Sequence, residues 1–229
     1  MKSLLAFICI CFCFQNAWAQ KTKTFKVKPG EKVVDAIPKD DKYSYPEFMM
    51  GNVHYRSGEH YPAKLNYNSL FQEMQFIDSK GDTLSLVNAM TIKHIIINTD
   101  TFFYDKSYLK LLAAYGKIKL AGNELITFAD RQKVGGFGEE SSARIDTYKS
   151  LQVGPTFTEL VAKEVLTFVK RTVFYLGDEF NHFKQASKKS LLDFYPSKSR
   201  EIKNYLKENK VDFSNQDDLE KMIAFLNGQ

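Results

Sequence analysis

Alternation of apolar and polar residues dominates the first half of the chain. Between residues 48 and 128, short runs alternate with period two and are separated by Gly, Asn, Asp or Ser, which is typical of antiparallel strands joined by tight turns. Residues 108–114 also fit a short helix, but the strand is favoured. The predicted strands are residues 48–55, 61–67, 73–78, 83–87, 92–98, 101–104, 108–114, 117–120 and 125–128.

A glycine-rich segment separates this region from two more predicted strands. Residues 132–142 contain Gly-Gly-Phe-Gly followed by Glu-Glu-Ser-Ser, a composition typical of a loop. Residues 160–169 and 173–176 are rich in Val, Phe and Thr and predict strands. The glycine cluster lacks the Lys-Ser/Thr of a P-loop and the spacing of a dinucleotide-binding turn, so it predicts no phosphate site.

The period changes to that of a helix after Gly177. Residues 187–196 predict a short helix that ends at a proline, and residues 199–210 carry apolar side chains at helical spacing. In the final helix, Ser214 is predicted to be the N-cap, because Asp217 follows three residues later as in a capping box. The apolar face of this helix comprises Leu219, Met222, Ile223 and Leu226.

These patterns together predict an α+β fold. Its main part is an antiparallel β body, a meander or a partly open barrel, and a C-terminal helical pair packs on it. The predicted divisions are a signal peptide (residues 1–19), an N-terminal arm or edge strand (20–42), the β-rich body (43–177) and the helical segment (178–229).

The start of the chain has the pattern of a signal peptide. Lys2 precedes an apolar run over residues 4–14, and an Ala-Trp-Ala motif at residues 17–19 matches the signal peptidase recognition pattern. We predict cleavage between Ala19 and Gln20, and export to the periplasm, the outer membrane or the extracellular space. The cysteines of the run follow bulky residues, which disfavours lipoprotein processing.

Composition narrows the chemistry further. All 3 cysteines lie in the predicted signal peptide, so the mature chain has neither disulfides nor thiolate chemistry. Removal of 19 residues from 229 leaves enough for one large domain or two small ones. Basic residues (32) and acidic residues (27) are spread along the chain, which argues against nucleic acid as a partner. Beyond the signal peptide, no apolar run approaches the roughly 20 residues of a membrane span.

Several segments together resemble a family of uncharacterised exported proteins of the Bacteroidota type. In such proteins a hairpin precedes a tight turn and a Leu-x-Leu strand, and a helical tail closes the chain. The resemblance implies export and this order of elements, but no activity and no site residues. The segments that carry it are LNYNSLFQEMQF (residues 65–76), GDTLSL (81–86), IKHIII (92–97) and IKNYLKENKVDFSNQDDLEKMIAFLN (202–227).

One polar set is a candidate binding patch. Strand alternation predicts that Asn66, Asn68, Glu73 and Gln75 share one face of a hairpin. The favoured interpretation is a solvated sheet face with Asn side chains bonded to a turn, and the other is a polar binding patch. If the first half of the chain has a site, we expect it there.

The remaining candidates are histidines. His54 and His60 flank a predicted turn and are weak candidates for metal ligands, but no third ligand has suitable spacing, so no metal is predicted. No Gly-x-Ser-x-Gly elbow and no calcium-loop register are present. The sequence therefore predicts no catalytic residue and no cofactor.

Two functions remain open. The first is a non-enzymatic binding or structural module of the cell envelope, with an envelope protein or a surface component as partner; homo-oligomerisation stays open. The alternative is an envelope hydrolase acting on glycans or peptides. Loss of the single tryptophan with the signal peptide makes a dedicated sugar-stacking face less favoured.

Overall fold

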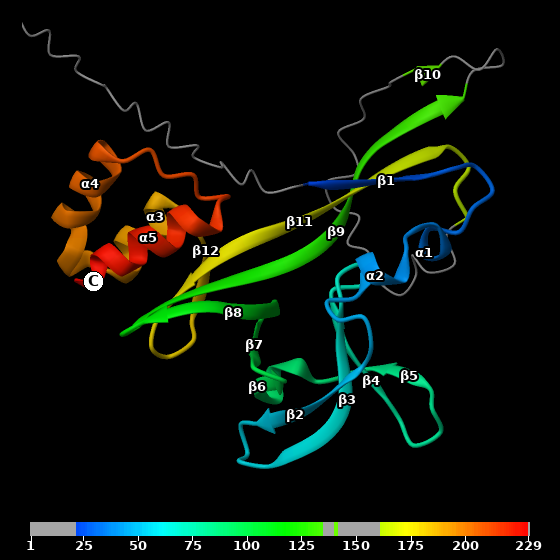
Figure 1. Ribbon diagram of the computed structural model, residues 1–229, viewed down its shortest axis with the longest axis horizontal. Coiled ribbons are helices and arrows are strands. Elements are labelled where there is room, and N and C mark those ends of the chain that lie inside the picture. Colours follow the sequence, from blue (N-terminus) through cyan, green and yellow to red (C-terminus); the bar gives the residue numbers. More distant parts are fainter. Residues whose placement is uncertain (1–21, 135–139, 142–160, 229) are drawn as a thin grey trace, which may run out of the picture.

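The computed structural model describes residues 22–134, 140–141 and 161–228. These residues form mainly an antiparallel sheet, and the longer helices gather at the C-terminal end of the chain (Figure 1). The predicted α+β class with a mainly antiparallel body is confirmed. None of the helices in the described part of the chain has the length and apolar character needed to cross a lipid bilayer.

The sheet consists of two meanders joined by the pairing of β2 with β6. Its strands follow the order β1-β11-β9-β8-β7-β6-β2-β3-β4-β5, with β10 beside β9 and β12 beside β11. The strands are β1 (Lys23–Val27), β2 (Met49–Tyr55), β3 (His60–Asn68), β4 (Glu73–Ile77), β5 (Thr83–Ser85), β6 (Ile92–Ile97), β7 (Asp100–Asp105), β8 (Ser107–Tyr115), β9 (Ile118–Val134), β10 (Glu140–Ser141), β11 (Val165–Gly177) and β12 (Phe183–Gln185).

The helices fall into two groups. Two short helices follow the edge strand β1, and three longer ones follow β12, with 3-10 turns at η1 (Ala89–Thr91) and η4 (Pro196–Lys198). The helices are α1 (Val33–Ala36), α2 (Lys39–Lys42), α3 (Lys188–Phe194), α4 (Ser199–Glu208) and α5 (Gln216–Leu226).

The C-terminal helices cover one end of β9 and β11 (Figure 1). The four predicted apolar residues of α5 are no more than 1% exposed and pack in one cluster with Leu120 of β9 and Leu176 of β11. The predicted cap of α5 was wrong by one residue, because the N-cap is Asn215 rather than Ser214. The Asn215 Oδ1 accepts a hydrogen bond from the backbone N–H of Asp218 at 3.0 Å.

Two strand boundaries also differ from prediction. Residues 117–120 and 125–128 were predicted as separate strands, but β9 continues through Ala121 to Glu124, which pair with β11 without interruption. Gly and Asn are typical of turns, yet Asn123 is buried here and accepts a hydrogen bond from Tyr67. Residues 165–169 and 173–176 likewise belong to one strand, β11, with a register shift at Thr167 and Phe168. Residues 161–164, predicted as part of a strand, precede β11, and residue 160 lies outside the described residues.

The predicted loop at residues 132–142 is described only in part. Residues 132–134 end β9, and Glu140–Ser141 form β10, which pairs with β9. Residues 135–139 and residue 142 lie outside the described part of the chain.

The sheet curls so that the end of β3 meets β9, although β8, β7, β6 and β2 lie between them in the strand order. The backbone N–H of Ile126 donates to the carbonyl of Ser69 at 2.9 Å, and the Tyr67 hydroxyl donates to Asn123 Oδ1 at 2.9 Å. This contact brings residues from distant parts of the sequence to one place inside the curl.

Candidate functional site

A pocket of about 220 Å³ lies inside this curl, beside the beginning of α5. The segment before β2, five strands and the first residue of α5 all contribute to its lining. The lining residues are Ser44, Tyr67, Phe102, Tyr108, Lys110, Leu112, Gly122, Glu124, Thr172 and Gln216.

A glycine opens part of the pocket wall. Lys110 of β8 pairs with Gly122 of β9, and both line the pocket. A Cβ atom at residue 122 would lie 3.0 Å from the Thr172 Cγ2 and 3.1 Å from the Leu112 Cδ1. Contacts this short require the neighbouring side chains to shift, so the absence of a side chain at Gly122 keeps space between them.

Aromatic rings form another part of the wall. The ring of Tyr67 lies 6.1 Å from that of Tyr108 and 6.3 Å from that of Phe102, in the range of favourable aromatic pairs. Burial raises the pKa of the Tyr67 hydroxyl, and the nearby carboxylate of Glu124 raises it further. Burial likewise raises the pKa of Tyr108. Both hydroxyls therefore stay protonated at neutral pH.

Among the residues that the structure describes, the hydroxyl of Tyr108 has no hydrogen-bond partner. The residue is only 4% exposed, and its oxygen is enclosed by protein. A buried polar group without a partner costs about 1–3 kcal/mol. The pocket wall therefore contains a feature that lowers the stability of the folded protein.

The charged groups of the pocket form two ion pairs. Lys110 Nζ lies 2.7 Å from Asp100 Oδ2, and Lys170 Nζ lies 2.9 Å from Glu124 Oε1. The Tyr45 hydroxyl also donates to Asp100 Oδ2, at 2.5 Å. Burial acts to raise the pKa of Asp100, but hydrogen bonds from Lys110 and Tyr45 outweigh it and hold this pKa below its usual value. The four charges around the pocket thus balance.

The predicted polar set does lie together on one face of the β3–β4 pair. Asn66 is opposite Gln75, and Asn68 is opposite Glu73. This face is not solvated as the favoured interpretation expected, because Asn66, Asn68 and Gln75 are buried. Its role as a binding patch stays a prediction.

Hydrogen bonds within the protein engage these polar side chains. Asn66 bonds to the backbone N–H and carbonyl of Tyr45, so it fixes the segment before β2 against β3. Asn68 Oδ1 accepts from the backbone N–H groups of residues 70 and 71, as expected for an Asn in a turn. Gln75 Oε1 accepts from the Asn68 amide, and Glu73 Oε2 accepts from the hydroxyl of Ser85.

Three histidines lie side by side on adjacent strands. His54 of β2 pairs with His60 of β3 and with His94 of β6, and its ring lies 5.6 Å and 4.5 Å from theirs. Burial lowers the pKa of His94, and His54 and Lys93 lower it further. Within the described residues, no group of three or more His, Cys, Asp or Glu side chains has an arrangement that could hold a metal ion.

The pocket residues were missed by sequence reasoning. Gly122 and Glu124 lie in a stretch that was interpreted as a break between two strands. Lys110 has the same alternating sequence context as the other lysines of the predicted strands, so nothing singled it out. One signal in the sequence could have indicated a continuous strand around Gly122. The predicted strands on both sides of it contain the apolar residues typical of a buried strand. The predicted cleavage residues Ala19 and Gln20 lie outside the described residues.

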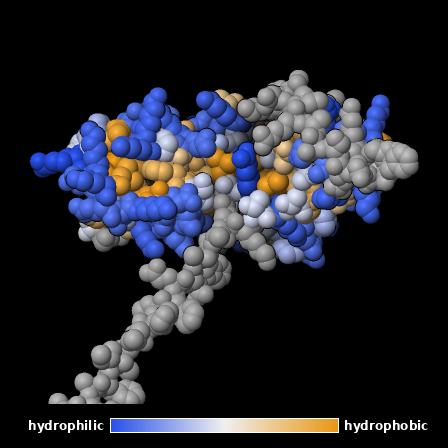
Figure 2. Space-filling model, turned by 90° about the horizontal axis from the view of Figure 1, so that it is seen from above, coloured by the Kyte–Doolittle hydropathy of each residue, from blue (hydrophilic) through white to orange (hydrophobic). Residues whose placement is uncertain are grey.

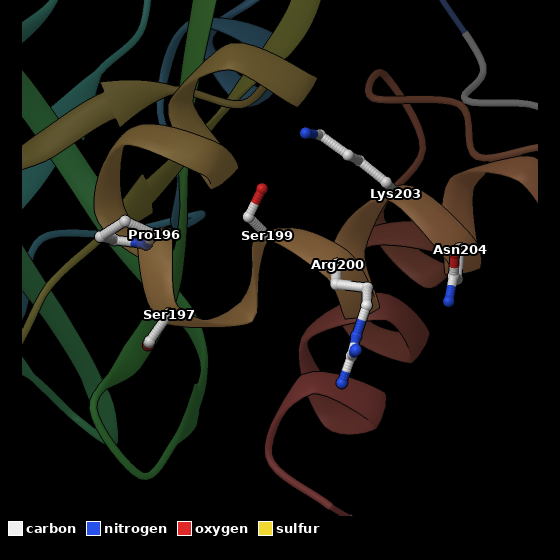
Figure 3. A pocket seen from close by; sticks show the side chains of 6 residues that line it. All are labelled: Pro196, Ser197, Ser199, Arg200, Lys203 and Asn204. Atoms are coloured by element: carbon white, nitrogen blue, oxygen red, sulfur yellow. The ribbon is translucent and has the colours of Figure 1, made fainter.

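A second, wider hollow of about 560 Å³ lies on the surface at the start of α4 (Figure 3). The side chains of Arg200 and Lys203 point in different directions in Figure 3. Both are exposed, so this hollow does not gather groups around one ligand. The lining residues are Pro196, Ser197, Ser199, Arg200, Lys203 and Asn204.

Comparisons of the chain with protein-family models, characterised proteins and solved structures find no significant match. Its class is defined by a curled antiparallel sheet with a C-terminal helical cover and a small pocket inside the curl. Function must therefore be argued from the site rather than from the fold.

Proposed function

We propose that this protein is an exported, non-enzymatic binding module of the cell envelope that holds a surface component in the pocket. The observation that carries the proposal is the pairing of both charged lining residues, Lys110 with Asp100 and Glu124 with Lys170. Paired charges beside aromatic walls suit recognition of a ligand. Among the described lining residues Glu124 is the carboxylate and none is a histidine, whereas glycoside hydrolysis generally uses two carboxylates.

Export is supported by the signal peptide pattern at residues 1–19 and by the resemblance to exported proteins.

A contact with a larger envelope component is supported by the surface. Figure 2 shows a band of hydrophobic residues between hydrophilic flanks, running from the side of the C-terminal helices toward the middle of the molecule. Large exposed apolar patches are typical of interaction surfaces. In the C-terminal part of the chain, Phe180 and Phe225 are exposed.

The proposal is tested by retention of the mature protein on washed envelope fragments. We expect the wild type to sediment with the fragments and Gly122→Ala to be retained at least 10-fold less, because the added methyl group crowds the pocket wall. Lys110→Gln serves as a second pocket variant in case Gly122→Ala folds poorly. Lys26→Gln, an exposed change on β1, should bind like the wild type.

Two outcomes would reject the proposal. Equal retention of the wild type and both pocket variants would exclude the pocket as the binding site. Release of shortened glycans or peptides from the fragments, detected by mass spectrometry and abolished by Glu124→Gln, would favour the hydrolase alternative.

A further inference from the structure

We infer that the pocket takes a neutral ring that carries several hydroxyl groups, such as a single sugar unit of an envelope glycan. This inference rests on the proposed function and adds the chemical class of the ligand. Its basis is the combination of donors, acceptors and rings that the pocket presents.

The charges around the pocket select a neutral ligand. Lys110 and Lys170 are balanced by Asp100 and Glu124. A charged ligand would be attracted by one of the lining residues Lys110 and Glu124 and repelled by the other, so it would gain no net attraction to offset the loss of its hydration. A neutral ligand meets no such repulsion, and it leaves both ion pairs in place.

The two charged lining residues call for groups that both donate and accept hydrogen bonds. The Lys110 ammonium is only a donor, and the Glu124 carboxylate is only an acceptor. A hydroxyl group serves both. The hydroxyl of Ser44 donates to Glu124 Oε2 at 3.4 Å and can still accept, and the hydroxyl of Thr172, which also lines the pocket, can do both.

A ligand with several hydroxyls can reach both Lys110 and Glu124. Lys110 pairs with Gly122, and Glu124 lies two residues further along β9. The Cα atoms of such diagonal neighbours in an antiparallel pair lie about 7–8 Å apart. Hydroxyls on different carbons of one ring can therefore bond to both side chains.

The size and the lining of the pocket also favour a single small ring as the ligand. The pocket, at about 220 Å³, is smaller than the roughly 300–1,000 Å³ of sites for drug-sized ligands, so it suits a single small ring. Phe102, Tyr67 and Tyr108 supply apolar surface for the C–H groups of that ring. The missing tryptophan matters less here than on an open surface, because a pocket contacts its ligand from several sides.

The test is an NMR titration of the mature protein, observing the backbone amide signals of Gly122 and Thr172. The neutral probes are methyl β-D-glucopyranoside and N-acetyl-D-glucosamine, the charged ones are D-glucuronate and D-glucosamine, and N-acetylglycinamide represents a single small amide. We expect at least one neutral sugar to shift both signals with a Kd of about 1 mM, the order expected for so small a ligand. Both charged sugars should bind at least 10-fold more weakly.

Variants separate this inference from the proposed function. Gly122→Ala should weaken the neutral sugar at least 10-fold, while Lys26→Gln should leave its Kd unchanged. Absence of shifts from both neutral sugars, or stronger binding of a charged probe or of N-acetylglycinamide, would overturn the ligand class. If envelope fragments still retain the wild type and not the pocket variants, the proposed function stands despite that failure.

Discussion

Tyr108 contributes a buried hydroxyl that has no hydrogen-bond partner in the described part of the chain. We expect Tyr108→Phe to raise the free energy of unfolding by about 1 kcal/mol, because the ring stays and only the unpaired hydroxyl is lost. Tyr67→Phe is the matched control. It should lower stability by about 1 kcal/mol, because Tyr67 donates to the buried Asn123. Urea unfolding of both variants measures the difference, and equal losses in the two would contradict this account.

The row of three histidines gives stability a pH dependence. The folded state lowers the pKa of His94 from 6.5, so at acid pH the folded state binds fewer protons than the unfolded one. The stability that the neutral imidazole contributes is complete above pH 6.5 and decreases as the pH falls below it. Unfolding free energies from about pH 7.5 to about pH 5 should fall more steeply for the wild type than for His94→Gln. Parallel pH profiles would refute the prediction.

At the scale of elements, the beginning of α5 offers a direct comparison of two neighbouring residues. Asn215→Ala should cost about 1 kcal/mol of stability, because its side chain caps the backbone N–H of Asp218. Ser214→Ala should change stability by much less. Thermal unfolding of the two variants shows which residue caps the helix. A larger loss of stability for Ser214→Ala would indicate that Ser214 is the N-cap, as predicted from the sequence.

Most elements were predictable because their periodicity repeats locally. The strand at residues 108–114 was correctly preferred over a helix, and the apolar stripe of α5 matched its buried face. The break predicted inside β9 was wrong, because turn propensity at Gly122 and Asn123 was overridden by tertiary contacts. Thr172 and Leu112 crowd any side chain added at residue 122, and the Tyr67 hydroxyl donates to the Asn123 side chain.

At the scale of the whole molecule, the pocket was beyond prediction because it depends on the curl of the sheet. Lys110, Glu124 and Thr172 lie on the neighbouring strands β8, β9 and β11, but Ser44 and Tyr67 join them only because the end of β3 returns to β9. The local sequence around these residues contains no pattern that predicts the contact between the end of β3 and β9. The polar set on β3 and β4 was predicted from alternation alone, and its position on one face follows the register.

The proposed export gives a further prediction for the intact chain. Mass spectrometry of the protein recovered from the envelope or the medium should find Gln20 as the first residue, because the Ala-Trp-Ala motif ends at Ala19. Ala19→Leu should leave the precursor uncut, while Gln20→Ala should not. Recovery of an uncleaved wild-type chain outside the cytoplasm would contradict the predicted signal peptide.

The pairing of β1 with β11 bears on when the sheet can be completed. Lys23 of β1 lies opposite Lys170 of β11. The first strand after the proposed signal peptide can therefore pair only after β11, which is synthesised much later. Contacts between residues so distant in sequence form slowly, because the chain must first close a long loop. The sheet is therefore complete only after most of the polypeptide has been synthesised, a delay that suits the proposed export because an unfolded chain can pass through a narrow channel.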